Sequence, residues 1–253
     1  MTLDVVTIFP GFFEGPFQYG ILRRARESGL LETALHDLRL FTHDRHRTVD
    51  DRPFGGKEGM VLKPEPLFDA VEHIRSLGRR HPRVILLSAQ GRLFRQPLAT
   101  KLAQEESLIL LCGRYEGVDQ RVAQGLADEE ISIGDFVLSG GELAAAVVAD
   151  SVARLMPGAL GNAASALHES FSSPSGADRV GLLDCAQYTR PAVFRDMQVP
   201  EVLLSGDHQR IAQWRKRNAF ENTWRNRPDL LEQAHLDREQ QEWLEELRRQ
   251  DRL

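Results

Sequence analysis

LILLCGRYEGVDQRVAQGLADEEISIGDFVLSGGE, residues 108–142, decides the fold of this chain. It begins with an apolar run of strand length at 108–112 and continues through a glycine-bearing loop and a helical run at 118–126. A second short apolar run follows at 130–133. Short apolar strands that alternate with helical runs are typical of a parallel α/β sheet. Ligands of such sheets bind beyond the carboxyl ends of the strands, where this stretch places its glycines.

The same alternation extends to both sides of this stretch. Further strands are predicted at 3–9, 33–41 and 84–88, and further helices at 17–28, 67–77, 95–105 and 142–155. The last of these helices is apolar on nearly every side, which is typical of a helix buried in a core or at a subunit interface. Residues 42–60 have neither a helical nor a strand period. Long irregular loops of this kind are often functional.

The composition changes after Pro157. Residues 157–181 are rich in Gly, Ala, Ser and Pro, as mobile linkers are, and the chain beyond them is almost entirely helical. We therefore predict an α/β domain at 1–160, a linker at 161–180 and a small all-helical domain at 181–253.

The overall charge of −5, from 32 Lys plus Arg and 37 Asp plus Glu, argues against a general nucleic-acid coat protein. The charge is unevenly distributed, however. Residues 210–227 hold six basic residues and one acidic residue, whereas residues 228–253 hold four basic and eight acidic residues. The arginines of the first block are candidates for phosphate contacts, although such clustering is as typical of a solvated helix.

Several classes of protein are excluded by what the sequence lacks. Cys112 and Cys185 are too few for a disulfide framework or a zinc site made of thiolates. There is no phosphate-binding GxxxxGK[ST] loop, no GxGxxG motif after a strand, and no GxSxG motif around Ser139. A basic leader is absent, and no apolar stretch reaches the ~18 residues of a membrane span. We expect a cytoplasmic protein without a metal site.

Three glycine-bearing loops follow predicted strands, at 88–92, 112–117 and 132–141. Glycine lets backbone N–H and C=O groups approach a ligand closely. The loops lack the Lys and the Ser or Thr that hold a triphosphate, so they favour an adenosine without phosphates. The alternative is a set of ordinary turns between strands and helices.

Four motifs together resemble a known family. They are RTVDDRPFGGKEGM (47–60), LLCGRYEGVDQR (110–121), SIGDFVLSGGELAA (132–145) and GLLDCAQYTRP (181–191). In this order and spacing they are similar to the bacterial tRNA (guanine-N1)-methyltransferases of the SPOUT class. The similarity continues through PEVLLSGDHQRIAQWRKR (200–217) to RPDLL (227–231).

The resemblance implies a fold and an activity. Members of the family transfer a methyl group from S-adenosylmethionine to the N1 atom of guanosine at position 37 of tRNA, next to the anticodon. Their α/β domain contains a deep trefoil knot and is followed by a helical tRNA-binding domain. They are homodimers whose active sites draw on both subunits.

The family's cofactor contacts carry over to nine positions of this sequence. Phe136 replaces a more common Tyr, which removes a hydroxyl group but keeps the ring, and Ala89 replaces a usual Pro. The resemblance implies that S-adenosylmethionine contacts Leu87, Gly113, Tyr115, Glu116, Ile133, Gly134, Phe136, Leu138 and Gly141.

The chemistry of N1 methylation requires two groups. Removal of the N1 proton moves negative charge toward O6, so the site needs a base near N1 and a hydrogen-bond donor or cation near O6. The resemblance assigns the second role to Arg154. From the residues alone, an arginine that complements the dipole at the end of a helix is the better interpretation of Arg154.

The position of the base departs from the family. Glu169 stands where the family has an Asp, and an extra methylene group leaves the same acid. Glu169 is therefore our candidate base. Asp184 and Asp178 are alternatives, and a solvated linker acid remains a further interpretation of Glu169.

Two further regions resemble segments that contact tRNA. In 42–60 the candidates are His46, Asp50 and Arg52, whereas Asp51 is expected only to fix the loop through local hydrogen bonds. In the C-terminal region they are Asp184, Arg215, Arg217 and Arg227. Asn222 and Asn226 stand where the family often has Arg, which predicts a shallower dependence of binding on salt. Whether a divalent ion assists cannot be read from the sequence.

Two other functions are compatible with the motifs. One is a SPOUT enzyme that modifies a different RNA, such as a ribose hydroxyl of ribosomal RNA. The other is an RNA-binding protein that has lost catalysis together with the family's Asp, because sites rather than folds decide function.

Overall fold

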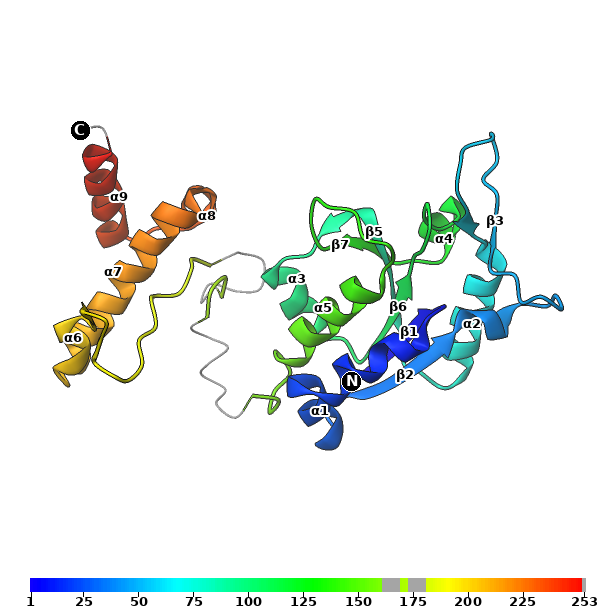
Figure 1. Ribbon diagram of the computed structural model, residues 1–253, viewed down its shortest axis with the longest axis horizontal. Coiled ribbons are helices and arrows are strands. Elements are labelled where there is room, and N and C mark those ends of the chain that lie inside the picture. Colours follow the sequence, from blue (N-terminus) through cyan, green and yellow to red (C-terminus); the bar gives the residue numbers. More distant parts are fainter. Residues whose placement is uncertain (161–168, 173–180, 252–253) are drawn as a thin grey trace. The chain divides into compact units, whose positions relative to one another are not determined.

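The computed structural model describes residues 1–160, 169–172 and 181–251, and the chain divides into two compact units, Met1–Ala163 and Ala164–Leu253 (Figure 1). Each unit is described by itself below. In the described residues no helix combines the length and the apolar character needed to cross a membrane.

The first unit is built on a five-stranded parallel sheet, as predicted. The strands are β1 (Thr2–Thr7), β2 (Glu32–Asp37), β5 (Arg83–Leu93), β6 (Ser107–Cys112) and β7 (Glu129–Ser132), in the order β2-β1-β6-β5-β7. Every residue of β6 is buried, because this central strand is covered on both faces. A continuous apolar run such as LILLC is the sequence pattern of a strand in that position.

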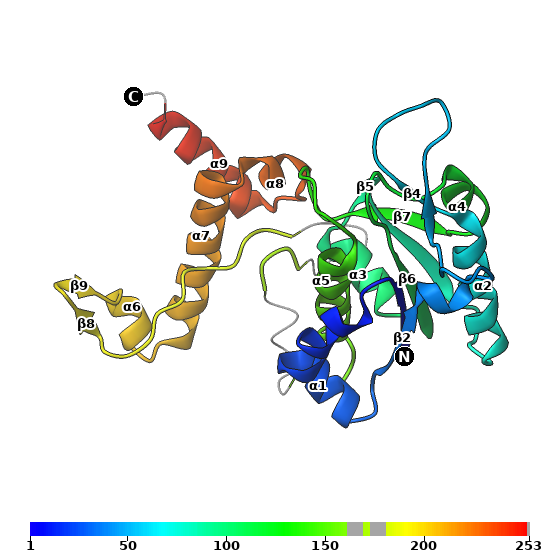
Figure 2. The same cartoon turned by 45° about the vertical axis from the view of Figure 1, so that its right-hand side comes forward.

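Helices cover both faces of this sheet (Figure 2). On one face lie α1 (Gly20–Glu27), α3 (Gln96–Leu102) and α5 (Glu142–Ala153), whose apolar side chains pack on Leu108 and Leu110. On the other lie α2 (Pro64–Ser76) and α4 (Gln120–Gly125), which pack on Ile109 and Leu111. Alternate residues of β6 therefore serve the two halves of the core.

Two strand predictions need correction. The strand predicted at 84–88 continues to Leu93, with a break in its register against β7 between Leu87 and Arg92. Gly91 permits this, since a Cβ there would lie 2.4 Å from the backbone of Glu130. The strand predicted at 33–41 ends at Asp37, whose side chain caps a 3-10 helix, η3 (Leu38–Phe41), by accepting a hydrogen bond from Arg39 N.

Within the irregular segment 42–60, residues 52–60 form a loop that is closed at its base by a short antiparallel pair. β3 (Asp50–Asp51) pairs with β4 (Val61–Leu62). Two more 3-10 helices, η1 (Pro10–Glu14) and η2 (Pro16–Gln18), follow β1.

The second unit contains α6 (Glu201–Leu204), α7 (His208–Asn226), α8 (Pro228–Gln233) and α9 (Arg238–Gln250). The prediction of an all-helical domain was wrong in one respect, because β8 (Val193–Phe194) and β9 (Met197–Gln198) form a short hairpin. Its two turn residues, Arg195 and Asp196, both have positive φ, as in the tight turns that suit the twist of a hairpin. A sequence without Asn-Gly or Asp-Gly gave little sign of this turn.

Candidate active site

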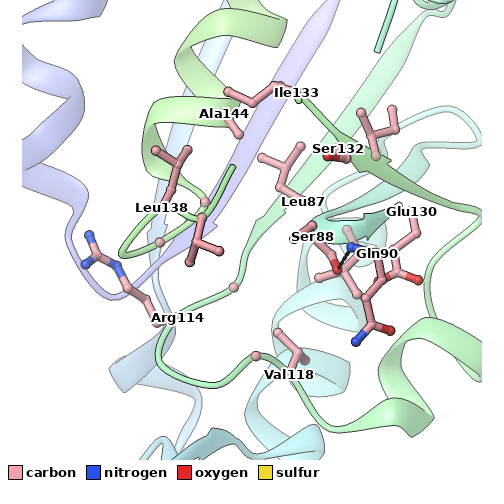
Figure 3. Close-up of a pocket in the computed structure, with 18 of the residues that line it drawn as sticks. Leu87, Ser88, Gln90, Arg114, Val118, Glu130, Ser132, Ile133, Leu138 and Ala144 are labelled. Atoms are coloured by element: carbon pink, nitrogen blue, oxygen red, sulfur yellow. Dashed lines mark hydrogen bonds between the residues drawn. The ribbon is translucent and has the colours of Figure 1, made fainter. Parts of the chain in front are cut away.

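A cavity of about 290 Å³ lies at the carboxyl edge of the sheet. Its walls come from three segments: Leu86–Gln90 of β5, the loop after β6 and the loop after β7. In Figure 3, Leu87 lies between two sides of the cavity, with Leu138 and Arg114 on one side and Gln90 and Glu130 on the other. All nine residues proposed to contact the cofactor line this cavity: Leu87, Gly113, Tyr115, Glu116, Ile133, Gly134, Phe136, Leu138 and Gly141.

The glycines are required by close backbone contacts. Gly141 N donates a hydrogen bond of 2.8 Å to Gly113 O, which joins the two loops, and a Cβ on Gly141 would lie 2.8 Å from Cys112 Cα. Gly134 has a φ of 154°, and a Cβ there would lie 2.4 Å from the ring of Phe136. A side chain at either position would therefore distort the cavity wall.

The lining suits a nucleoside that carries a positive group. Leu87, Ile133 and Leu138 offer apolar contact to a flat base, and the loop backbones offer hydrogen-bonding groups at close range. The Glu116 carboxylate is the complement of a sulfonium or an amino group. These residues thus fit S-adenosylmethionine.

Tyr115 links the cavity to the irregular segment. Burial raises the pKa of the Tyr115 phenol, and a hydrogen bond to Asp50 raises it further, so the hydroxyl stays protonated at neutral pH. Asp50, predicted to contact tRNA, is thus placed beside a residue predicted to contact the cofactor.

The backbone joins the same two regions. Glu116 N donates to Met60 O, Leu62 N to Gly117 O, and Asp119 N to Leu62 O, each at 3.0 Å. The segment 42–60 is therefore anchored on a loop that lines the cavity. His46 and Arg52 are exposed, and Asp51 accepts a 2.7 Å hydrogen bond from Arg52 N, which is the local role expected for it.

Comparison with known proteins places the chain in a family. The model of the tRNA (Guanine-1)-methyltransferase TrmD family matches residues 1–233. The tRNA (guanine-N(1)-)-methyltransferase of Koribacter versatilis is 56% identical over 260 residues, which cover 98% of this chain and 98% of that protein. The protein of the same name from Geobacillus kaustophilus is 51% identical, with 97% and 98% covered, and that from Anoxybacillus flavithermus is 49% identical over the full length of both chains.

The chain belongs to this family. The resemblance carried by the four sequence motifs is thereby confirmed, and with it the interpretation of the chain as a tRNA (guanine-N1)-methyltransferase. For a member of this family the cavity is the place to look for the methyl donor.

The two candidate catalytic residues belong to different units. Arg154 is half-buried and forms the C-terminal cap of α5, where its N–H donates to Asp150 O. Glu169 is half-buried, and its carbonyl oxygen accepts from Ser172 N. Of the alternative bases, Asp178 lies outside the described residues. Asp184 accepts hydrogen bonds from Cys185 N at 2.7 Å and from Gln187 Nε2 at 2.9 Å.

The arginines proposed to contact tRNA differ in their surroundings. Arg217 forms ion pairs with Glu221 at 2.6 Å and with Glu246 at 2.8 Å, and Arg227 pairs with Asp229 at 2.7 Å. Arg215 is exposed and, within the part of the chain that the structure describes, meets no carboxylate. Asn222 and Asn226 make hydrogen bonds to backbone carbonyls, of Asp184 and of Asn222 respectively.

Sequence reasoning missed a buried polar group beside the cavity. Thr7 and Glu142 are each 1% exposed, and Thr7 Oγ1 donates a 2.7 Å hydrogen bond to Glu142 Oε1. Arg114 completes the group through Glu142 Oε2. The one available signal was an acidic residue at the start of a largely apolar helix.

The buried Cys112 thiol beside the cavity is not a reactive nucleophile. Burial, followed by the charge of Glu142, raises the pKa of the Cys112 thiol well above its usual value, so this cysteine is an inert core residue. Among the described residues, no group of three or more His, Cys, Asp or Glu side chains is placed to hold a metal ion.

Proposed function

We propose that this chain transfers the methyl group of S-adenosylmethionine to N1 of guanosine at position 37 of tRNA, next to the anticodon. The observation that carries the proposal is the cavity at the carboxyl edge of the sheet, in a chain that belongs to this family. Its three loops bring together residues from positions 87 to 141, and all of the family's cofactor positions are among them. A tRNA substrate also implies that the enzyme acts in the cytoplasm.

The cofactor is held by the chain's own loops in this proposal. Leu87, Ile133 and Leu138 would offer apolar contact to the adenine ring, Gly113 and Gly141 would let it approach the loop backbones closely, and the Glu116 carboxylate would complement positive charge. Tyr115, Gly134 and Phe136 complete the walls of the same cavity. When bound, S-adenosylmethionine supplies a methyl group on a sulfonium, which is already a good electrophile. The remaining task of the protein is therefore to make guanine N1 nucleophilic and to orient it.

Glu169 and Arg154 perform that task. Glu169 accepts the N1 proton, and the Arg154 guanidinium stabilises the negative charge that moves to O6. The target base must leave its stack to reach them, as in other enzymes that act on a nucleobase. A glutamate in place of the family's aspartate requires only that the backbone lie about one methylene length further away.

In this proposal the tRNA contacts both the segment 42–60 and the second unit. His46, Asp50 and Arg52 belong to a segment whose backbone is bonded to the loop of Glu116, so tRNA bound there lies near the cofactor. Of the three arginines named from the sequence in the second unit, Arg215 is the one whose guanidinium has no ion pair among the described residues. Asp184, Arg217 and Arg227 already have polar partners, so their contacts with tRNA would require an exchange of partners.

The family's knot and its dimer are part of the proposal. β7 lies at the edge of the sheet, next to β5. The chain that follows β7 nevertheless returns to the loop after β6, where Gly140 and Arg114 form an antiparallel bridge. This return supports a trefoil knot in a catalytic domain of about residues 1–160, followed by a linker at 161–180 and a tRNA-binding domain at 181–253. Leu143 and Val147 of α5 remain 50% and 44% exposed, as expected if a second copy covers them in a homodimer with active sites at its interface.

Methyl transfer to a tRNA transcript tests the proposal. Labelled S-adenosylmethionine, the full chain and a transcript with guanosine at position 37 are expected to yield 1-methylguanosine, identified by mass spectrometry of the nucleosides. The matched control is the same transcript with adenosine at position 37, which should remain unlabelled. A 2′-O-methyl nucleoside, or no transfer to either transcript, would contradict the proposal.

A further inference from the structure

We infer that Glu142, with Arg114 and Thr7, holds the loop after β6 and the loop after β7 together at the cofactor cavity. This group of contacts thereby sets the affinity for S-adenosylmethionine. Glu142 and Thr7 are positioning residues, because neither lines the cavity, whereas Arg114 lines one side of it and connects Glu142 to the loops. The inference rests on the proposed function, since it takes S-adenosylmethionine as the ligand.

The contacts join three segments that are distant in sequence. Glu142 Oε1 accepts from Thr7 Oγ1 at the end of β1, at 2.7 Å. Glu142 Oε2 accepts from Arg114 Nε and lies 2.9 Å from Arg114 Nη2, so the loop after β6 is bound to the start of α5. Thr7 Oγ1 in turn accepts from Phe9 N at 3.0 Å. One carboxylate thus connects β1, the loop of residues 113–117 and α5.

The guanidinium of Arg114 reaches the third segment. Its Nη1 donates a 3.2 Å hydrogen bond to Ser139 O, in the loop after β7. A Cβ on Gly140 would lie 2.1 Å from Arg114 Nε, so the guanidinium fills the space that a glycine leaves open. The Phe9 ring covers the guanidinium, with 4.5 Å from its centroid to Arg114 Cζ. Figure 3 places Arg114 beside Leu138, with its guanidinium directed away from Leu87.

The carboxylate is in an environment that demands these partners. Glu142 is 1% exposed in a helix whose other buried residues are all apolar, and a buried charge without partners is strongly unfavourable. Its position in the first turn of α5 adds the favourable effect of the helix dipole. Removing one partner therefore loosens both the loop after β6 and the loop after β7, and not only one contact.

The consequence for the cofactor follows from what the loops carry. Tyr115 and Glu116 come directly after Arg114, and Leu138 and Gly141 flank Ser139 and Gly140. If the fastening is lost, the unliganded loops sample more conformations, and binding must restore the competent one. The dissociation constant and KM for S-adenosylmethionine then rise, whereas kcat at saturating cofactor changes little.

Titration calorimetry with the full chain and S-adenosylmethionine tests this. Glu142→Gln preserves volume and the acceptor for Thr7 but removes the charge that Arg114 faces, and we expect its Kd to rise about tenfold, or about 1.4 kcal/mol. Arg114→Lys keeps a charge but loses the fork and should give an intermediate Kd. Arg114→Met and Glu142→Gln each break the same ion pair. The double variant should therefore bind S-adenosylmethionine no more weakly than the weaker-binding of these two single variants.

The matched control is Glu129→Gln. It breaks the ion pairs of Glu129 with Arg83 at 2.8 Å and with Arg92 at 3.6 Å, and Glu129, Arg83 and Arg92 do not line the cavity. We expect a lower Tm with an unchanged Kd.

Three outcomes separate the possibilities. Wild-type chain that does not bind S-adenosylmethionine would refute the proposed function itself. Wild-type binding together with a Glu142→Gln Kd within about twofold of it would overturn the inference alone. If Glu142→Gln does not fold, Thr7→Val decides, because it removes the hydrogen bond to Glu142 at a residue that does not line the cavity. A wild-type Kd overturns the inference, and a raised Kd with kcat retained at saturation supports it.

Discussion

The identity of the base at position 169 is the sharpest question at the residue scale. Glu169→Gln keeps the size of the side chain but cannot accept a proton. General-base catalysis contributes about 10²–10⁴-fold, so we expect single-turnover methyl transfer at saturating tRNA and cofactor to slow by at least about 100-fold. Glu169→Asp restores the residue that the family uses and is expected to retain most of the rate. A Gln variant that reacts at a near-normal rate would exclude Glu169 and direct attention to Asp184 and Asp178.

The sequence could identify individual site residues only where a motif carries them. Gly113, Gly134 and Gly141 stand in motifs and line the cavity, and a side chain at Gly134 or Gly141 would distort it. Glu142 also stands in a motif, but its partner Thr7 lies 135 positions away, and the local sequence of Glu142 does not indicate which residue it contacts. Which side chains meet, as Thr7 and Glu142 do, is decided by how the loops after the strands pack in three dimensions, and this packing cannot be read from a single sequence.

The segment 42–60 is the element with the clearest unfilled role. Phe54 at its tip is fully exposed, although the base of the segment is fixed by β3, β4 and the loop of Glu116. Stacking of a base on an aromatic ring contributes about 1–3 kcal/mol. We expect Phe54→Ala to raise the KM for tRNA about tenfold, equivalent to about 1.4 kcal/mol, with an unchanged Kd for S-adenosylmethionine. Phe54→Trp should retain the wild-type KM; equal KM values for all three proteins would show that the ring does not contact tRNA.

The start of α9 gives a prediction about stability. Asp237 caps this helix in a reciprocal capping box with Gln240, and hydrogen bonding to Gln240 N, followed by Lys216, lowers the pKa of Asp237. Because this pKa is lowered in the folded state, the Asp237 carboxylate stabilises the fold at pH values above its ordinary pKa near 4. This stabilisation is lost as the pH falls through the folded-state pKa. Asp237→Ala should cost about 1 kcal/mol at pH 7. Asp237→Asn should keep the cap but reduce the loss of stability below about pH 4, as measured by urea unfolding at several pH values; identical pH profiles would contradict this.

Elements were predictable where their period was strong. The parallel strands and the helices around them follow from apolar runs that the sheet buries on both faces. The extension of β5 and the hairpin of β8 and β9 did not follow, since the first depends on Gly91 facing the β7 backbone and the second on two residues with positive φ. Both are set by tertiary contacts or by turn geometry rather than by a repeated pattern.

At the scale of the whole molecule, the charge of −5 says little about RNA binding because opposite charges pair inside the second unit. Lys216 contacts Glu239 at 2.6 Å and Asp237 at 3.0 Å, and Arg217 contacts Glu246 of α9. The acidic C-terminal region therefore neutralises part of the basic block at 210–227. Among the described residues, the arginines of that block whose guanidinium groups have no carboxylate partner are Arg210, Arg215 and Arg225.

This pairing predicts how tRNA binding depends on salt. Each phosphate that is neutralised contributes about 0.7–0.9 to the slope of log K against log salt concentration. Arg215→Ala should reduce the slope by about that amount, whereas Arg217→Ala should reduce it by clearly less, because Glu221 and Glu246 already hold that guanidinium. Arg217→Ala should instead lower the Tm, since the side chain also lies 5.1 Å over the Trp243 ring. Filter binding of a guanosine-37 transcript over a range of salt concentrations measures both slopes, and equal reductions would mean that Arg217 leaves its acidic partners for phosphate when tRNA binds.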